Sequence, residues 1–131
     1  MAITLNDAVR DLLDGRNYAT VATINPDGSP QTSVVWITRD GDDVLFCTVR
    51  GRRKERNLTR DPRVSLSVVD SVDAENYAEI RGTATVSDHG GRELINTLSL
   101  KYDGKAFPVE PADRVRVVVR VTPNKVAGHA A

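Results

Sequence analysis

Short runs of β-branched residues, separated by turn-forming residues, recur along the chain and limit the folds open to it. Tyr18–Ile24 is such a run, and Asn25-Pro26-Asp27-Gly28 connects it to a second one, Gln31–Thr38. Proline presets one backbone angle and glycine accepts a positive φ, so the connecting residues favour a tight turn. Residues 18–38 are therefore predicted to form a β-hairpin.

Four further strands are expected from the same kind of pattern: Val44–Val49, Val64–Val69, Tyr77–Ser87 and Arg114–Thr122. Gly82 marks a bulge or a close approach within the third of these. In the last, one face carries four alternating valines: Val115, Val117, Val119 and Val121. The connections are mostly short, which fits hairpins better than βαβ crossovers. We therefore predict a mainly β fold, a six-stranded antiparallel β-barrel whose closure removes exposed edges.

A few short helices are expected to flank the strands. Apolar residues at helical spacing follow Thr4 as far as Leu13, and Arg52–Arg60 and Gly90–Leu100 have helical character. Thr4 is the expected N-cap of the first helix. The chain of 131 residues is predicted to be a single domain, 1–131, with a loose tail over residues 123–131.

Composition excludes several classes of function. Eighteen basic residues balance eighteen acidic ones, so no global affinity for nucleic acid or a membrane surface is indicated. Cys47 is the single cysteine and is expected to be a small buried hydrophobe, and His89 and His129 lie in no metal-binding spacing, so no metal is expected. No apolar run reaches the roughly 20 residues of a membrane span, and no signal peptide is evident, so we expect a cytoplasmic protein.

The segment Arg50–Arg60 is the sharpest local feature, because six of its eleven positions are basic. It follows a strand and a glycine, so Arg52–Lys54 are expected at a helix N-terminus, where free N–H groups and the helix dipole favour anions. Arginine and lysine also pair with phosphate or carboxylate. The segment therefore predicts a phosphate or polyanion site, with a solvated basic face as an alternative of equal weight.

Polar side chains on both faces of the second strand form another candidate site. Gln31, Thr32 and Ser33 could hydrogen-bond a planar heterocycle or a phosphate, although an ordinary hydrated edge strand is the more common explanation. Trp36 and Tyr77 could stack on a flat ring, but strand aromatics usually belong to the core. No catalytic triad motif is present.

Three motifs occur in an order that resembles the flavin and deazaflavin split β-barrel superfamily, of which pyridoxamine phosphate oxidases are the best-known members. They are YATVATINPDGSPQTSVVWI, VLFCTVRGRRKERNLTRDPRVSLSV and YAEIRGTATV. The resemblance extends from about Leu5 to Thr122. Any one motif alone is weak evidence, whereas the ordered combination is specific.

This resemblance implies a homodimer with two cofactor sites at the subunit interface. It assigns the cofactor phosphate to residues matching Thr48, Arg52, Arg53, Lys54, Arg56 and Asn57. It assigns the ring of the cofactor to the strand matching Gln31, Thr32, Ser33 and Val34. A residue near Tyr77 commonly comes from the other subunit, and Tyr77 is the one candidate for a catalytic proton donor.

Within this resemblance, the short length and the Arg-, Val- and Asp-rich sequence are similar to the deazaflavin-dependent branch of the superfamily. That branch is similar to enzymes that use coenzyme F420 to reduce enones, quinones or tetrapyrroles. We therefore expect an F420-dependent oxidoreductase that transfers a hydride to an electron-poor double bond. An FMN-binding oxidoreductase on the same fold and a non-enzymatic carrier of F420 or a tetrapyrrole are the alternatives.

Overall fold

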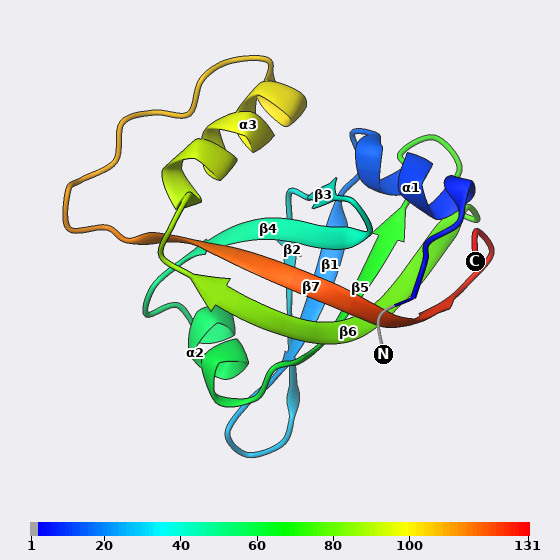
Figure 1. Cartoon of the computed structure of the whole chain (residues 1–131), viewed down its shortest axis with the longest axis horizontal. Helices are drawn as coiled ribbons and strands as arrows, with labels where there is room; N and C mark the ends of the chain where they lie inside the picture. The colour runs from blue at the N-terminus through cyan, green and yellow to red at the C-terminus, as the bar shows by residue number, and fades with distance from the viewer. Residues whose placement is uncertain (1–2) are drawn as a thin grey trace.

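Seven strands form one antiparallel sheet in the computed structural model, which describes residues 3–131 (Figure 1). Residues 1 and 2 of the predicted domain lie outside the described residues. The order across the sheet is β2-β1-β5-β6-β7-β4-β3. The strands are β1 (Ala19–Ile24), β2 (Pro30–Val35), β3 (Thr38–Asp40), β4 (Asp43–Val49), β5 (Arg63–Val69), β6 (Tyr77–Ser87) and β7 (Arg116–Ala127).

The predicted mainly β, antiparallel fold is confirmed, but the prediction of six strands in a closed barrel is wrong. The expected strand 31–38 is two strands, β2 and β3, separated by Trp36 and Ile37. β2 pairs with β1, whereas β3 pairs with β4. These two strands are the opposite ends of the sheet, so the sheet is not closed.

The predicted hairpin between β1 and β2 is confirmed. The Asn25 N–H donates to the Ser29 carbonyl at 2.8 Å, and the Gly28 N–H donates to the Asn25 carbonyl at 2.8 Å. The strand pairs that follow run from Ile24 opposite Pro30 to Ala19 opposite Val35. The turn therefore fixes which side chains of β2 face the interior of the sheet.

One face of the curved sheet forms the core, because side chains alternate between buried and exposed along every long strand. Val117, Val119 and Val121 of β7 are fully buried, as the alternation predicted. Val115 is 39% exposed, because β7 begins only at the next residue.

The end of the chain is also ordered, contrary to the predicted loose tail over residues 123–131. β7 continues to Ala127 and pairs with β6, and the N–H of the buried Ala130 donates to the Tyr77 carbonyl at 3.0 Å. The pairing shifts register between Arg81 and Gly82, which confirms the predicted irregularity. A Cβ at Gly82 would lie 2.3 Å from the Thr122 carbonyl oxygen, so only glycine allows this close approach.

Three helices flank the sheet: α1 (Asp7–Asp14), α2 (Arg53–Arg60) and α3 (Gly91–Asp103). The N-cap of α1 is Asn6 and not Thr4, since the Asn6 side chain accepts from the Val9 N–H at 2.8 Å. In Figure 1, α3 lies beside β4 and β7, and α2 lies at the opposite end of β6 from α1. No helix in residues 3–131 is long and apolar enough to cross a membrane.

Candidate functional site

A cleft of about 180 Å³ lies where β2 stops pairing with β1 and the chain begins to pair with β4 as β3. Its lining comes from four segments that are distant in sequence: the end of β2 with Trp36, the middle of β4, the start of α2 and one side of α3. The residues are Val34, Val35, Trp36, Cys47, Arg52, Lys54, Ile95 and Leu98. Apolar walls beside two cationic groups suit a ligand that joins a flat apolar ring to an anion.

Two strand edges border this cleft. β2 pairs with β1 alone, and β3 covers only the first residues of β4, Asp43–Leu45. In the described part of the chain, neither the outer edge of β2 nor the remainder of that edge of β4 has a strand partner. Such edges present main-chain N–H and C=O groups that can hydrogen-bond the heteroatoms of a bound ring.

The six basic residues of the segment Arg50–Arg60 differ in their pairing. Arg50 is paired with Asp88 and lies 3.3 Å from Glu55. Arg60 donates to the side chain of Asn57 and to the main chain of Ile24. The other four have no ion pair with a carboxylate among the described residues: Arg52, Arg53, Lys54 and Arg56. Four neighbouring unpaired cations favour an anionic ligand.

The start of α2 supports the same conclusion. Gly51 adopts a positive φ of 96°, which turns the chain from β4 into the helix. Arg52 is the N-cap and makes no side-chain capping hydrogen bond. Main-chain N–H groups of the first turn therefore remain available to an anion, close to the side chains of Arg52 and Lys54.

Glu55 holds this turn in place. Its carboxylate is buried and accepts from the Gly51 N–H at 2.7 Å and from the Thr59 hydroxyl at 2.7 Å. Burial alone would raise the pKa of Glu55, but these hydrogen bonds and the charge of Arg50 outweigh it and lower the pKa. The single acidic residue of the segment is thus ionised, and its hydrogen bonds hold the turn at Gly51 against α2.

Lys54 is half-buried in the cleft wall. Burial, with a smaller contribution from the charge of Arg52, lowers the pKa of its ammonium group. An anion placed between Lys54 and Arg52 would offset both effects. Lys54 and Arg52 therefore both favour an anion at this position in the cleft.

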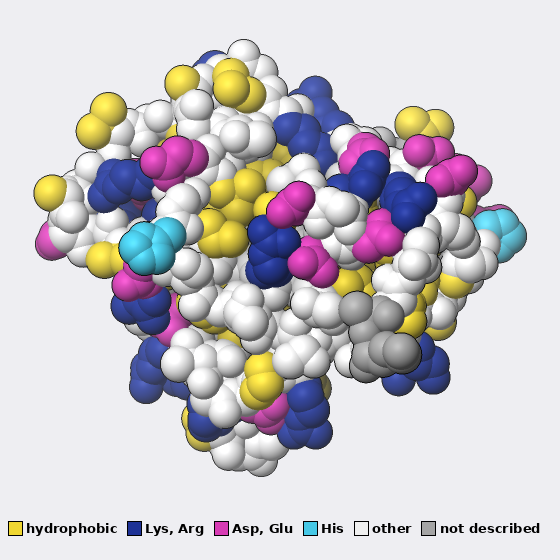
Figure 2. Space-filling view, viewed as in Figure 1, with side chains coloured by type: hydrophobic (Ala, Val, Ile, Leu, Met, Phe, Trp, Pro, Cys, Tyr) yellow, Lys and Arg dark blue, Asp and Glu magenta, His cyan; other side chains and the backbone are white. Residues whose placement is uncertain are grey.

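Arg53 faces a different part of the surface. It lines a separate hollow with Asn25, Pro26 and Asp27 at the β1–β2 turn. Figure 2 shows Lys and Arg side chains around the lower part of the molecule, where Figure 1 places α2 and this turn. The structure thus brings Arg52 and Lys54 into the cleft and leaves Arg53 outside it.

Asn57 is fully buried and ties α2 to the hairpin. Its amide donates to the Thr23 hydroxyl and to the Asn25 side chain, both at 3.0 Å. Thr23 in turn donates to the Gln31 side chain at 2.6 Å. Two of the predicted site residues, Asn57 and Gln31, are therefore linked to each other and do not line the cleft.

Two buried hydroxyl groups have no hydrogen-bond partner among the described residues. They belong to Ser33 on β2 and Thr48 on β4, the two strands that border the cleft. A buried polar group without a partner costs about 1–3 kcal/mol. A polar ligand that reached these hydroxyls would remove that cost, but neither side chain lines the cleft. Thr32 and Val34, also predicted site residues on β2, are exposed.

Tyr77 lies far from the cleft of its own chain. It is 39% exposed at the start of β6, whereas the Ala84 N–H of the same strand donates to the carbonyl of Pro62, just after α2. Seven residues of strand separate these positions by about 23 Å. Within one chain, Tyr77 therefore does not join the cationic residues.

Cys47 lines the cleft, and its thiol is not activated as a nucleophile. Burial raises the pKa of its thiol to about 12, and the thiol donates to the Gly91 carbonyl at 3.6 Å. The sequence did not identify Val35, Ile95 or Leu98 as site residues. The helical spacing of the last two predicted a helix, but it could not show that β2 lies opposite them.

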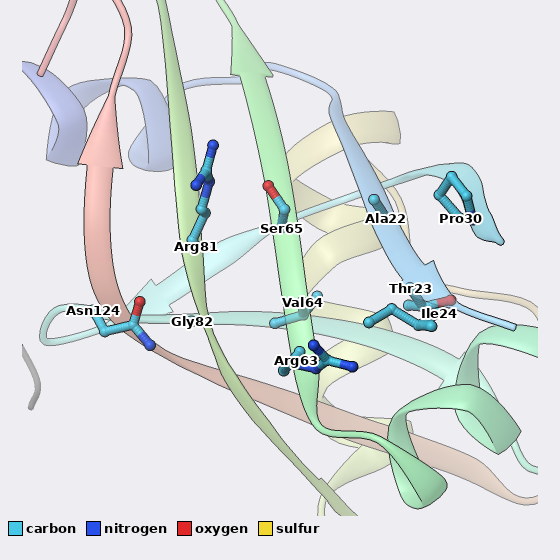
Figure 3. Close-up of a pocket in the computed structure, with 10 residues that line it drawn as sticks. All are labelled: Ala22, Thr23, Ile24, Pro30, Arg63, Val64, Ser65, Arg81, Gly82 and Asn124. Atoms are coloured by element: carbon cyan, nitrogen blue, oxygen red, sulfur yellow. The ribbon is translucent and has the colours of Figure 1, made fainter. Parts of the chain in front are cut away.

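A larger hollow of about 350 Å³ lies over β1, β5 and β6, and Figure 3 shows its lining residues. Its two cations are already paired, Arg63 with Asp61 at 2.7 Å and Arg81 with Glu79 at 3.2 Å. Unlike the cleft, it therefore offers an anion no unpaired charge. No group of three or more His, Cys, Asp or Glu side chains that could hold a metal occurs in residues 3–131.

Comparisons with known proteins agree with this geometry. The family model for pyridoxamine 5'-phosphate oxidase matches residues 5–130. A solved F420 reductase is 30% identical, with a TM-score of 0.83 over 94% of this chain and 98% of its own. A conserved hypothetical protein from Mycobacterium tuberculosis (22% identity, TM-score 0.77, 95% and 84% coverage) and general stress protein 26 from Bacillus anthracis (16%, 0.71, 92% and 89%) share the fold. The chain therefore belongs to the pyridoxamine 5'-phosphate oxidase family, within the split-barrel superfamily of flavin and deazaflavin oxidoreductases.

Proposed function

We propose that this protein is an F420-dependent reductase that acts on an electron-poor double bond of a small organic molecule, such as an enone, a quinone or a tetrapyrrole. The observation that carries the proposal is the pair of unpaired cations, Arg52 and Lys54, at an uncapped helix start beside an apolar cleft. The 30% identity to an F420 reductase supports the choice of cofactor.

The residues of the chain have three tasks in this proposal. Arg52 and Lys54 bind the phosphate of the cofactor, with the first-turn N–H groups of α2. The edge of β2 at Gln31–Val34 hydrogen-bonds the ring, and Val34, Val35 and Trp36 keep water from it. When bound, F420 supplies the hydride, because its reactive ring position is a carbon. The protein contributes binding, orientation and exclusion of water.

FMN is the second candidate cofactor, because it also joins a phosphate to a tricyclic ring and the family model is that of an FMN-type oxidase. The number of cations favours F420. One phosphate can be satisfied by Arg52 and Lys54, which leaves Arg56 without an anionic partner. The anionic polyglutamate tail of F420 gives this additional cation a role that FMN does not.

We also propose that the protein works as a cytoplasmic homodimer in which each copy completes the cleft of the other. Tyr18, Val34 and Tyr77 are 51%, 65% and 39% exposed. Burial of such side chains between two copies would stabilise a dimer. The Tyr77 of a second copy is then the candidate proton donor. A stable monomer in light scattering at micromolar concentration would contradict this part of the proposal.

Parallel titrations with F420 and FMN test the choice of cofactor. Saturable binding of F420 that is tighter than that of FMN, followed by acceptor-dependent oxidation of the reduced form, is the expected result. Tight binding without turnover for any acceptor would indicate a carrier. Preferential binding of FMN would replace F420 by the flavin.

A further inference from the structure

The chain changes its partner strand at Trp36 and Ile37, and this exchange creates the cleft. β2 pairs with β1 as far as Val35 opposite Ala19. Two steps further in the same register, Ile37 would face Asn17. Instead, the next residue, Thr38, already pairs with Leu45 of β4.

The last turn of α3 occupies the place of the missing strand pair. The hydroxyl of Tyr102 accepts from the Ile37 N–H at 3.1 Å and donates to the Asn17 carbonyl at 2.5 Å. Lys101 donates from its ammonium group to the Ile37 carbonyl at 2.7 Å and to the Leu13 carbonyl at 2.7 Å. Two side chains of α3 thus satisfy the main-chain groups of Ile37 that a neighbouring strand would otherwise satisfy.

The consequence is a separation between β2 and β4. If the register of β3 and β4 continued backwards, Trp36 would pair with Cys47 and Val35 with Thr48. Val35, Trp36 and Cys47 instead line the cleft. The Trp36 ring stacks on Tyr102, with ring centroids 5.4 Å apart and planes 8° from parallel. Tyr102 therefore contacts both the backbone and the side chain that form this wall.

We propose that Tyr102 and Lys101 are positioning residues that hold β2 away from β4 and fix Trp36 in the wall of the cleft. Neither residue lines the cleft, so each acts on a bound ring only through Trp36 and the end of β2. The effect on ligand affinity rests on the proposed function. The effect on Trp36 does not.

An ordinary core position would not need these polar groups. Tyr102 is 1% exposed, and a phenylalanine would fill the same apolar volume without a hydroxyl. Burial lowers the pKa of Lys101 to about 8, so placing an ammonium group there has a cost. The carbonyls of Leu13 and Ile37 are the hydrogen-bond acceptors that compensate for it.

Trp36 is the single tryptophan of the protein, so its fluorescence reports on the cleft directly. The variants are Tyr102→Phe, which keeps the ring and removes the hydroxyl, and Lys101→Met, which keeps the apolar stem and removes the charge. Leu100→Ala is the matched control, because Leu100 belongs to the same helix and is 52% exposed. Each folded variant is measured for Trp36 emission, acrylamide quenching, and affinity for F420 and FMN.

We expect both variants to shift Trp36 emission and increase its quenching, with the control unchanged. Ligand affinity should fall about three- to tenfold for each, the effect of one or two lost hydrogen bonds. Wild-type emission, quenching and affinity in both variants would overturn the proposal, even if their melting temperatures were lower. If Tyr102→Phe does not fold, Lys101→Met decides by the same criteria. If the wild type binds neither F420 nor FMN, the proposed function fails, and the Trp36 measurements alone decide the positioning role.

Discussion

Replacing Arg52 or Lys54 by alanine should weaken cofactor binding while the protein remains folded. Each side chain lies at the cleft and is not paired with a carboxylate of the described residues, so it can form an ion pair with a bound anion. Charge-assisted hydrogen bonds contribute about 1.5–3 kcal/mol, which is roughly 10- to 100-fold in affinity. Lys54 is half-buried and should lie at the upper end of this range, whereas the more exposed Arg52 should lie near the lower end.

Arg53→Ala is the matched control, because Arg53 is an unpaired cation in the first turn of the same helix but lines a different hollow. Arg60, which lies beyond the predicted phosphate contacts, is less suitable because it hydrogen-bonds Asn57 and Ile24. Titration of F420 at constant ionic strength, with thermal melts of each variant, gives the comparison. Because Arg52 and Lys54 share one anion, the double variant should lose less than the sum of the single losses. Equal, small losses at all three positions would refute the assignment of the phosphate to the cleft.

Three further predictions follow from the charges of the segment. Affinity for F420 should fall as salt rises, and forms with longer anionic tails should bind at least as tightly as the tailless precursor at low salt. Equal affinity for both would show that Arg56 does not contact the tail. Only protonated Lys54 attracts the anion, and the pKa of Lys54 is lowered in the free protein. The affinity for F420 should therefore decline as pH rises through that lowered pKa. Lys54→Arg should abolish the decline in titrations at a series of pH values. Glu55→Ala should destabilise the fold by about 1–3 kcal/mol in denaturant melts at neutral pH, because the Gly51 N–H and the Thr59 hydroxyl lose their acceptor. Because the pKa of Glu55 is lowered in the folded protein, this difference in stability should be lost as pH falls through the folded pKa. A pH-independent difference would contradict the stabilising role of the ionised carboxylate.

Local patterns predicted the strands and helices well, because each depends on neighbouring residues. The run Gln31–Thr38 reads as one strand since nothing within it signals a break. At the break, the Ile37 N–H is bound by the hydroxyl of Tyr102, 65 residues later in the chain. A contact of that kind leaves no trace in the sequence around β2.

Prediction of the candidate site was limited in the same way, because the site also depends on contacts between distant segments. The sequence located the basic segment, but it could not separate Arg50 from Arg52, because the partner that neutralises Arg50 is Asp88, 38 residues away. The alternation of β7 predicted its buried valines, yet Pro123 suggested an end to the strand. The register shift at Gly82 accommodates this proline, and β7 continues.

Binding of F420 as a hydride donor in the cleft can be measured in an anaerobic experiment. The purified protein is mixed with reduced F420 and a small quinone, and the return of the oxidised cofactor's absorbance is followed for the wild type, Lys54→Ala and Arg53→Ala. We expect oxidation that depends on both protein and quinone, is strongly reduced in Lys54→Ala and is nearly unchanged in Arg53→Ala. No binding of F420 by the wild type, or equal rates in the two variants, would contradict it.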